Sequence, residues 1–156
     1  MIKYAFFDVD GTLSVPRYFM HGEMTLGTTD EEWIEFCRVH GKDSYENCLT
    51  SPPVRRFAEA LHKEGARLYV LSAITSDYET EGKTEFVSKR YPGLFEDFFY
   101  VRHESEKVPF ILAFAEKAGC APEETMLVED SLGILFPANC AGIVPKHISM
   151  LTANEV

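Results

Sequence analysis

Two aspartates stand one residue apart directly after a short apolar run near the start of the sequence. The run at residues 4–7 leads into Asp8 and Asp10, which are followed by Gly11 and Thr12. Carboxylates at the end of a buried strand are costly unless a partner offsets their charge. Because strand side chains two positions apart point the same way, both carboxyls could reach one phosphate, and Gly11 would allow a tight turn. The spacing alone is also consistent with a helix cap followed by a turn residue.

Polar side chains end two further apolar runs of the sequence. Glu129 and Asp130 follow one run, and Ser72 ends another. In an open parallel sheet, ligands bind in the crevice beyond the carboxyl ends of the strands. If these runs are parallel strands, the sheet gathers four carboxylates and one hydroxyl at a single edge.

Converging carboxylates repel one another, and either raised pKa values or a hard cation can settle such a site. Magnesium suits an oxygen-only set of ligands and keeps several waters. With magnesium in place, the site would attract phosphate esters and polarise phosphorus toward attack. One carboxylate could then form an acyl-phosphate, while a second protonates the leaving oxygen and later deprotonates a water.

The elements that must position these residues alternate between strands and helices, which predicts an α/β fold with a doubly wound parallel sheet and helices on both faces. Strands are predicted at residues 3–9, 66–72, 97–103, 124–130 and 143–149, and helices at 30–40, 51–65, 84–91, 108–119 and 131–142. Residues 14–28 are expected to be irregular, and the polar stretch 75–83 is expected to be a loop. Pro145 predicts an edge position for the last strand.

The composition restricts the class of partner. A length of 156 residues favours one compact domain, and a net charge of −10 disfavours nucleic acid and anionic membranes. A bound cation can reverse the local field, so a small anionic substrate remains compatible with this charge. The sequence has four cysteines without a CxxC pair, no apolar run of membrane-spanning length, and an N-terminus unlike a signal peptide. We therefore expect a cytoplasmic protein with reduced thiols.

Four segments, taken in order, resemble the signatures of the haloacid dehalogenase (HAD) superfamily. The segment FFDVDGTL resembles the first signature, DxDGT, and LYVLS is similar to the second, a hydrophobic strand that ends in Ser or Thr. Lys107, just before a predicted helix, resembles the third, and MLVEDS resembles the fourth. The matches run from residue 4 to about residue 142. The resemblance implies a Rossmann-like fold and a magnesium-dependent phosphatase that acts on a small phosphorylated metabolite.

The resemblance also implies a role for each matching residue. Asp8 would be the nucleophile, and Asp10 would be the general acid and base. Ser72 would hold a phosphoryl oxygen, and Lys107 would offset the negative charge on Asp8 and the phosphoryl group. The magnesium ligands would be Asp8, the backbone carbonyl of Asp10, Asp130 and, directly or through water, Glu129. The substrate contacts would be Gly11, Thr12 and Ala73.

Two features qualify this interpretation. The second acid of DxD favours phosphoryl transfer over carbon–halogen cleavage, because a halide leaving group needs no proton. Many relatives carry Asp or Asn four residues beyond the final acid of the fourth signature, where this chain has Ile134. Isoleucine cannot bind metal, so we expect the site to rely on Glu129 or to bind metal more weakly.

The resemblance predicts a core of residues 1–13 and 51–156, interrupted by a small helical cap at residues 14–50. Such a cap would shield little of the site. Two alternatives to a phosphatase stay open from the sequence. A phosphotransferase or mutase would use the same chemistry with another acceptor, and a non-catalytic relative would bind a phosphorylated partner.

Overall fold

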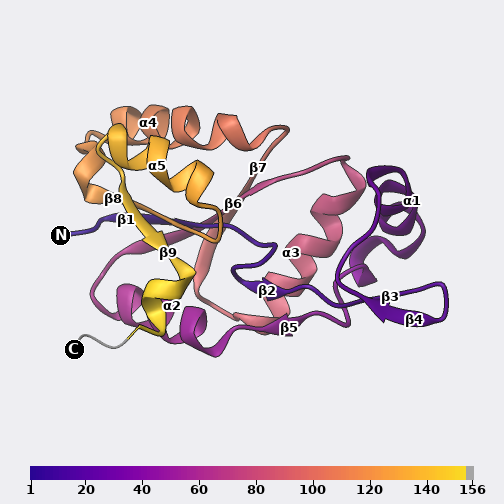
Figure 1. Ribbon diagram of the computed structural model, residues 1–156. Helices are drawn as coiled ribbons and strands as arrows, with labels where there is room; N and C mark the ends of the chain where they lie inside the picture. The colour runs from indigo at the N-terminus through magenta and orange to yellow at the C-terminus, as the bar shows by residue number, and fades with distance from the viewer. Residues whose placement is uncertain (154–156) are drawn as a thin grey trace.

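A five-stranded parallel sheet forms the centre of the protein in the computed structural model, which describes residues 1–153 (Figure 1). The strands lie in the order β7-β6-β1-β8-β9. Their bounds are β1 Tyr4–Phe7, β6 Arg67–Ala73, β7 Phe95–Val101, β8 Thr125–Glu129 and β9 Val144–His147. The predicted α/β parallel sheet is confirmed, and the strand with Pro145 lies at an edge as predicted.

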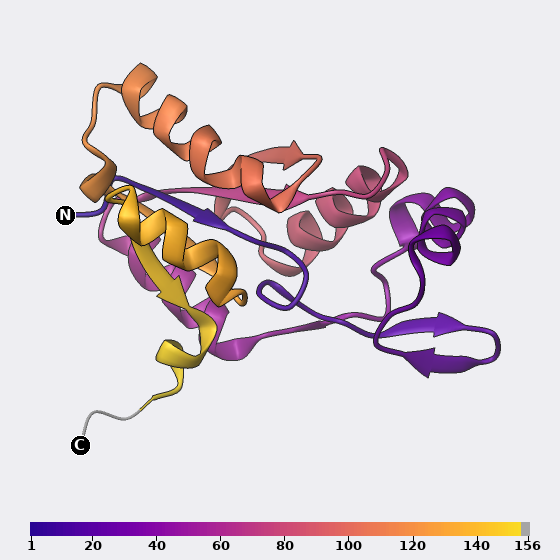
Figure 2. The same cartoon turned by 45° about the horizontal axis from the view of Figure 1, so that its top comes forward.

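Helices cover both faces of the sheet (Figures 1 and 2). The main helices are α1 Asp30–His40, α2 Pro52–Lys63, α3 Tyr78–Arg90, α4 Lys107–Ala118 and α5 Leu132–Cys140. Phe7 of β1 packs in a cluster with residues of α2 and α3, whereas its neighbour Phe6 packs with residues of α4 and α5. This alternation follows from the strand period of two, and it buries the central strand on both sides.

Local signals explain why α1 begins and ends where the sequence predicted. The Thr29 side chain accepts a hydrogen bond from the backbone N–H of Glu32, which caps the first turn. Gly41, with a φ of 53°, ends the helix at a conformation that favours glycine.

Residues 14–50 hold several short elements besides α1. They are β2 Ser14–Val15, the β3–β4 hairpin at Tyr18–Met20 and Glu23–Thr25, the 3-10 helix η1 Gly41–Asp43, and β5 Leu49–Thr50. The hairpin corrects the expectation that residues 14–28 are irregular; it projects from the rest of the molecule (Figure 2). A cap role for this segment stays a prediction.

The predicted loop at residues 75–83 is wrong from residue 78 onward, because α3 begins at Tyr78. The polar character of this stretch suggested solvent exposure. Glu79 and Lys83 are in fact buried and paired with each other across one turn of the helix. A helix that buries charged residues gives no apolar stripe in the sequence, which is why the periodicity missed it.

Three further 3-10 helices lie within the described residues: η2 Glu104–Glu106, η3 Pro122–Glu124 and η4 Ile148–Leu151. None of the helices within residues 1–153 has the length and apolar character needed to cross a membrane.

The cysteines provide a test of how firmly residues 14–50 pack on the rest of the chain. Cys37 and Cys48 of this segment are buried, and burial raises the pKa of the Cys37 thiol to about 12. Because the thiolate is the reactive form, both should resist a thiol reagent in the folded protein, whereas the exposed Cys140 reacts at once. Mass spectrometry after brief labelling with an aromatic disulfide checks this. Rapid labelling of Cys37 would show that the segment opens readily.

Candidate active site

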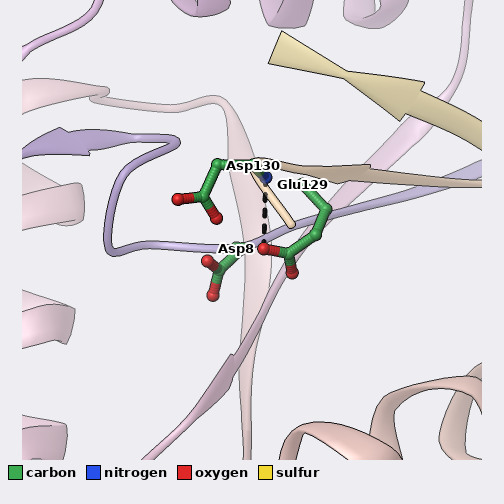
Figure 3. Close-up of side chains that lie close together, drawn as sticks. All are labelled: Asp8, Glu129 and Asp130. Atoms are coloured by element: carbon green, nitrogen blue, oxygen red, sulfur yellow. Dashed lines mark hydrogen bonds between the residues drawn. The ribbon is translucent and has the colours of Figure 1, made fainter. Parts of the chain in front are cut away.

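The structure brings the predicted acidic residues together at the carboxyl ends of β1 and β8. Asp8 directly follows β1, Glu129 ends β8, and Asp130 comes next (Figure 3). One carboxylate oxygen from each lies within 4.8 Å of the others. Asp8 and Glu129 are buried, whereas Asp130 is exposed. The arrangement is a carboxylate cluster that is open on one side.

Lys107 links two members of this cluster from the first residue of α4. Its side chain is 0% exposed, and Nζ donates to Oδ1 of Asp8 at 3.0 Å and to Oε2 of Glu129 at 2.8 Å. Glu104 contributes a third carboxylate contact at 2.8 Å. Burial disfavours the ammonium, but the carboxylates of Asp8 and Glu129 outweigh it and raise the pKa of Lys107. The lysine therefore stays charged beside Asp8.

The cluster is nonetheless short of positive charge. Burial raises the pKa of Asp8, and it raises the pKa of Glu129 to about 9, with the Asp8 charge adding to the second shift. Lys107 opposes both shifts but is shared between the two groups. A hard cation would favour the ionised forms, and the donor set here is oxygen only.

Gly11 makes room for the exposed carboxylate of the cluster. Its φ is 78°, and a Cβ at this position would lie 2.2 Å from Oδ2 of Asp130. The loop after β1 therefore approaches the Asp130 carboxylate so closely that a side chain at residue 11 would displace this carboxylate. Beside it, the buried Oγ1 of Thr12 makes no hydrogen bond within the described part of the chain. Both features fit a site in which the loop and Asp130 share a ligand.

A second buried lysine, which was not predicted from the sequence, lies beside Asp10 and Ser72. Lys83 of α3 is 0% exposed, and its Nζ donates to Oγ of Ser72 at 2.8 Å and to the carbonyl of Ala73 at 2.7 Å. It also pairs with Asp10 at 3.0 Å and with Glu79 at 3.2 Å. The only signal in the sequence was the spacing of Glu79 and Lys83, which suits a pair on one helix face.

Asp10 lies apart from the carboxylate cluster. Its Oδ1 accepts a hydrogen bond of 2.6 Å from the Tyr45 hydroxyl, and its Oδ2 faces Lys83. Asp10 and Ala73 line a hollow of about 730 Å³ together with Trp33 of α1. The two aspartates of the first motif therefore lie in different places: Asp8 belongs to the carboxylate cluster, and Asp10 lines the hollow.

Ile134 of α5, at the position where many relatives carry a polar residue, packs against the apolar core. It offers no oxygen to the cluster, as its chemistry dictates.

The close approach of Gly11 to Asp130 can be tested by comparing two glycines with similar backbones. Gly93 has a φ of 74°, and a Cβ added there would meet nothing within 4 Å, so Gly93→Ala tests backbone strain alone. Such strain costs about 1–2 kcal/mol of unfolding free energy. Gly11→Ala should cost about 0.5–1.5 kcal/mol more, because the new methyl overlaps the end of the exposed Asp130 side chain and forces it away from its present rotamer. Urea denaturation measures both losses, and equal losses would contradict the observed geometry.

No protein-family model and no curated protein matches this sequence. Solved structures do match it. The hypothetical protein XCC2798 from Xanthomonas campestris has a TM-score of 0.55 and 20% identity, over 92% of this chain and 62% of its own. The HAD family enzyme BT-2542 from Bacteroides thetaiotaomicron, in complex with magnesium and inorganic phosphate, has a TM-score of 0.53 and 17% identity, over 94% of both chains.

A third similar structure is 3-deoxy-D-manno-octulosonate 8-phosphate phosphatase from Moraxella catarrhalis, in complex with magnesium, phosphate and KDO. Its TM-score is 0.55 at 19% identity, over 90% of this chain and 64% of its own. This chain thus spans less than two thirds of the length of the Xanthomonas and Moraxella proteins.

At these levels of identity the comparisons establish the fold. That fold places the motifs of the sequence at the carboxyl edge of the sheet, where the carboxylate cluster was found. The chain therefore has the fold of the haloacid dehalogenase family, the family that its motifs resemble.

Proposed function

We propose that this chain is a magnesium-dependent phosphomonoesterase that works through an aspartyl-phosphate on Asp8. The observation that carries the proposal is the buried Asp8 carboxylate, held by Lys107 at 3.0 Å inside a cluster of three carboxylates. Two neighbours of the same fold were crystallised with magnesium and phosphate, which supports the same chemistry here.

Asp8, Asp130 and the backbone carbonyl of Asp10 would hold magnesium, with Glu129 as a ligand directly or through water. The close fit of Gly11 to Asp130 and the clustering of three carboxylates support this assignment. When bound, magnesium would neutralise part of the charge that the carboxylates and the phosphoryl group bring together.

In the first step, a carboxylate oxygen of Asp8 attacks phosphorus, and the bond from phosphorus to the ester oxygen breaks. Asp10 gives its proton to that leaving oxygen, so the product departs as a neutral alcohol. The Ser72 hydroxyl donates to a phosphoryl oxygen, and the Lys107 ammonium offsets charge on Asp8. The phosphoryl group is now bonded to the Asp8 carboxyl.

In the second step, water attacks the same phosphorus while Asp10 accepts its proton. The bond between phosphorus and the Asp8 oxygen breaks, and Asp8 is released as a carboxylate. Inorganic phosphate leaves, and Asp10 again carries the proton needed for the next cycle. One residue thus serves as acid and then as base.

The hollow beside Asp10 has a size that suits a small-molecule substrate. Its volume of about 730 Å³ lies within the range typical of small-molecule sites. We therefore propose a small phosphorylated metabolite as substrate, with residues 14–50 as a small cap and residues 1–13 and 51–156 as the catalytic core. The cysteines of the described chain are free, which supports a cytoplasmic location.

Activity measurements with a matched pair of variants test this function. Phosphate release from a panel of phosphorylated metabolites and p-nitrophenyl phosphate should require magnesium in the wild type. Asp8→Asn should reduce kcat/KM about 1,000-fold or more, because the amide cannot act as the nucleophile. Asp97→Asn makes the same change at an exposed position of β7 and should leave activity unchanged.

Two results would count against the proposal. The first is magnesium-dependent hydrolysis that persists in Asp8→Asn, which would move the nucleophile elsewhere. The second is a wild type that releases no phosphate from any member of the panel.

A further inference from the structure

The carboxylate of Asp10 is held from two sides by residues that lie outside the four motifs. The Tyr45 hydroxyl donates to Oδ1 at 2.6 Å, and the Lys83 ammonium lies 3.0 Å from Oδ2. Each carboxylate oxygen therefore has its own donor. Such a pair of contacts fixes both the position and the rotation of a carboxyl group.

The first donor to Asp10, the Tyr45 hydroxyl, belongs to residues 14–50 and is held in place by aromatic packing. Tyr45 follows η1 and is only 1% exposed, and its ring contacts those of Tyr18, Trp33 and Phe86, with centroids 5.8, 5.9 and 6.0 Å away. Burial, together with the Asp10 charge, raises the pKa of Tyr45 well above its usual value, so the hydroxyl keeps its proton. Tyr45 is a fixed hydrogen-bond donor.

The second donor to Asp10, the Lys83 ammonium of α3, is held in place by further polar contacts. Besides Asp10, Lys83 is held by Ser72, the carbonyl of Ala73 and Glu79, at distances from 2.7 to 3.2 Å. It therefore ties Asp10 to the hydroxyl that is expected to hold a phosphoryl oxygen. Any movement of Lys83 would disturb both groups.

The hollow that Asp10 lines could hold the leaving group to which Asp10 gives its proton. If Asp8 attacks the phosphorus, the leaving oxygen must come within about 3 Å of Asp10 for proton transfer. Proton transfer is sensitive to small misplacements of the donor, so a fixed carboxyl is an advantage. Asp10 lines the hollow, whereas Tyr45 and Lys83, which hold its carboxylate, do not.

We propose that Tyr45 and Lys83 are positioning residues that fix the Asp10 carboxyl against the leaving group of the substrate. The inference rests on the proposed phosphatase function. It gives the small segment 14–50 a part in the chemistry, because that segment supplies the Tyr45 hydroxyl. Neither residue touches the reacting atoms; both act through Asp10.

The acidity of the leaving group provides a selective test. Phenyl phosphate and p-nitrophenyl phosphate have nearly the same shape, but phenolate is the poorer leaving group and depends more on a proton from Asp10. In Tyr45→Phe, kcat/KM for phenyl phosphate should fall about tenfold, a part of the 100-fold or more that general acid catalysis supplies. For p-nitrophenyl phosphate the fall should stay below about threefold. A general loss of structure would lower both values equally.

Tyr91→Phe is the matched control. Tyr91 is also 1% exposed, but its hydroxyl donates to the carbonyl of Leu13 instead of Asp10. Its variant should keep the wild-type ratio of the two kcat/KM values. Lys83→Met should change this ratio in the same direction as Tyr45→Phe.

An active wild type with an unchanged ratio in Tyr45→Phe would overturn the positioning role and leave the phosphatase function intact. A wild type that hydrolyses neither ester would contradict the phosphatase function itself, and the inference would fall with it.

Discussion

Two buried ammonium groups hold the carboxyl edge of the sheet together. Lys83 and Lys107 are both fully buried, and a buried charge is tolerated only when it is well paired. Lys107 meets carboxylates of Asp8 and Glu129, from β1 and β8. Lys83 meets Asp10 and Ser72, from the loop after β1 and from β6. The contacts of these two lysines thereby connect the three central strands at the edge where the strands end.

The two lysines divide the site into two halves. Around Lys107 lie carboxylates proposed to attack phosphorus and to hold metal. Around Lys83 lie Asp10, which would deliver a proton, and Ser72, which would hold a phosphoryl oxygen. In the first half, burial and then the charge of Asp8 raise the pKa of Glu129 to about 9. A cation in that half would favour the ionised carboxylates.

The parts of this site that could be predicted from sequence are those whose signals are local. Asp8, Glu129 and Asp130 end apolar runs, so their common location followed from the fold class, whereas Lys107 was singled out by the resemblance of its segment to the third HAD signature. The helix α1 was predicted with its observed bounds because its capping pattern is contained within a few residues.

Lys83 and Tyr45 could not be found in the same way. Their contacts join residues 11 and 35 positions apart, and neither contact leaves a periodic pattern. The polar residues of α3 suggested a loop, although their partners lie inside the protein. The hairpin of β3 and β4 was missed because its strands are only three residues long.

We propose that Asp8 accepts the phosphoryl group beside a bound magnesium ion. Beryllofluoride mimics a phosphoryl group on an aspartate, and its protein-bound form has its own signals in fluorine NMR. We expect a bound signal that appears only with magnesium in the wild type and disappears in Asp8→Asn. A bound signal that persists in Asp8→Asn, or no bound signal in the magnesium-loaded wild type, would contradict it.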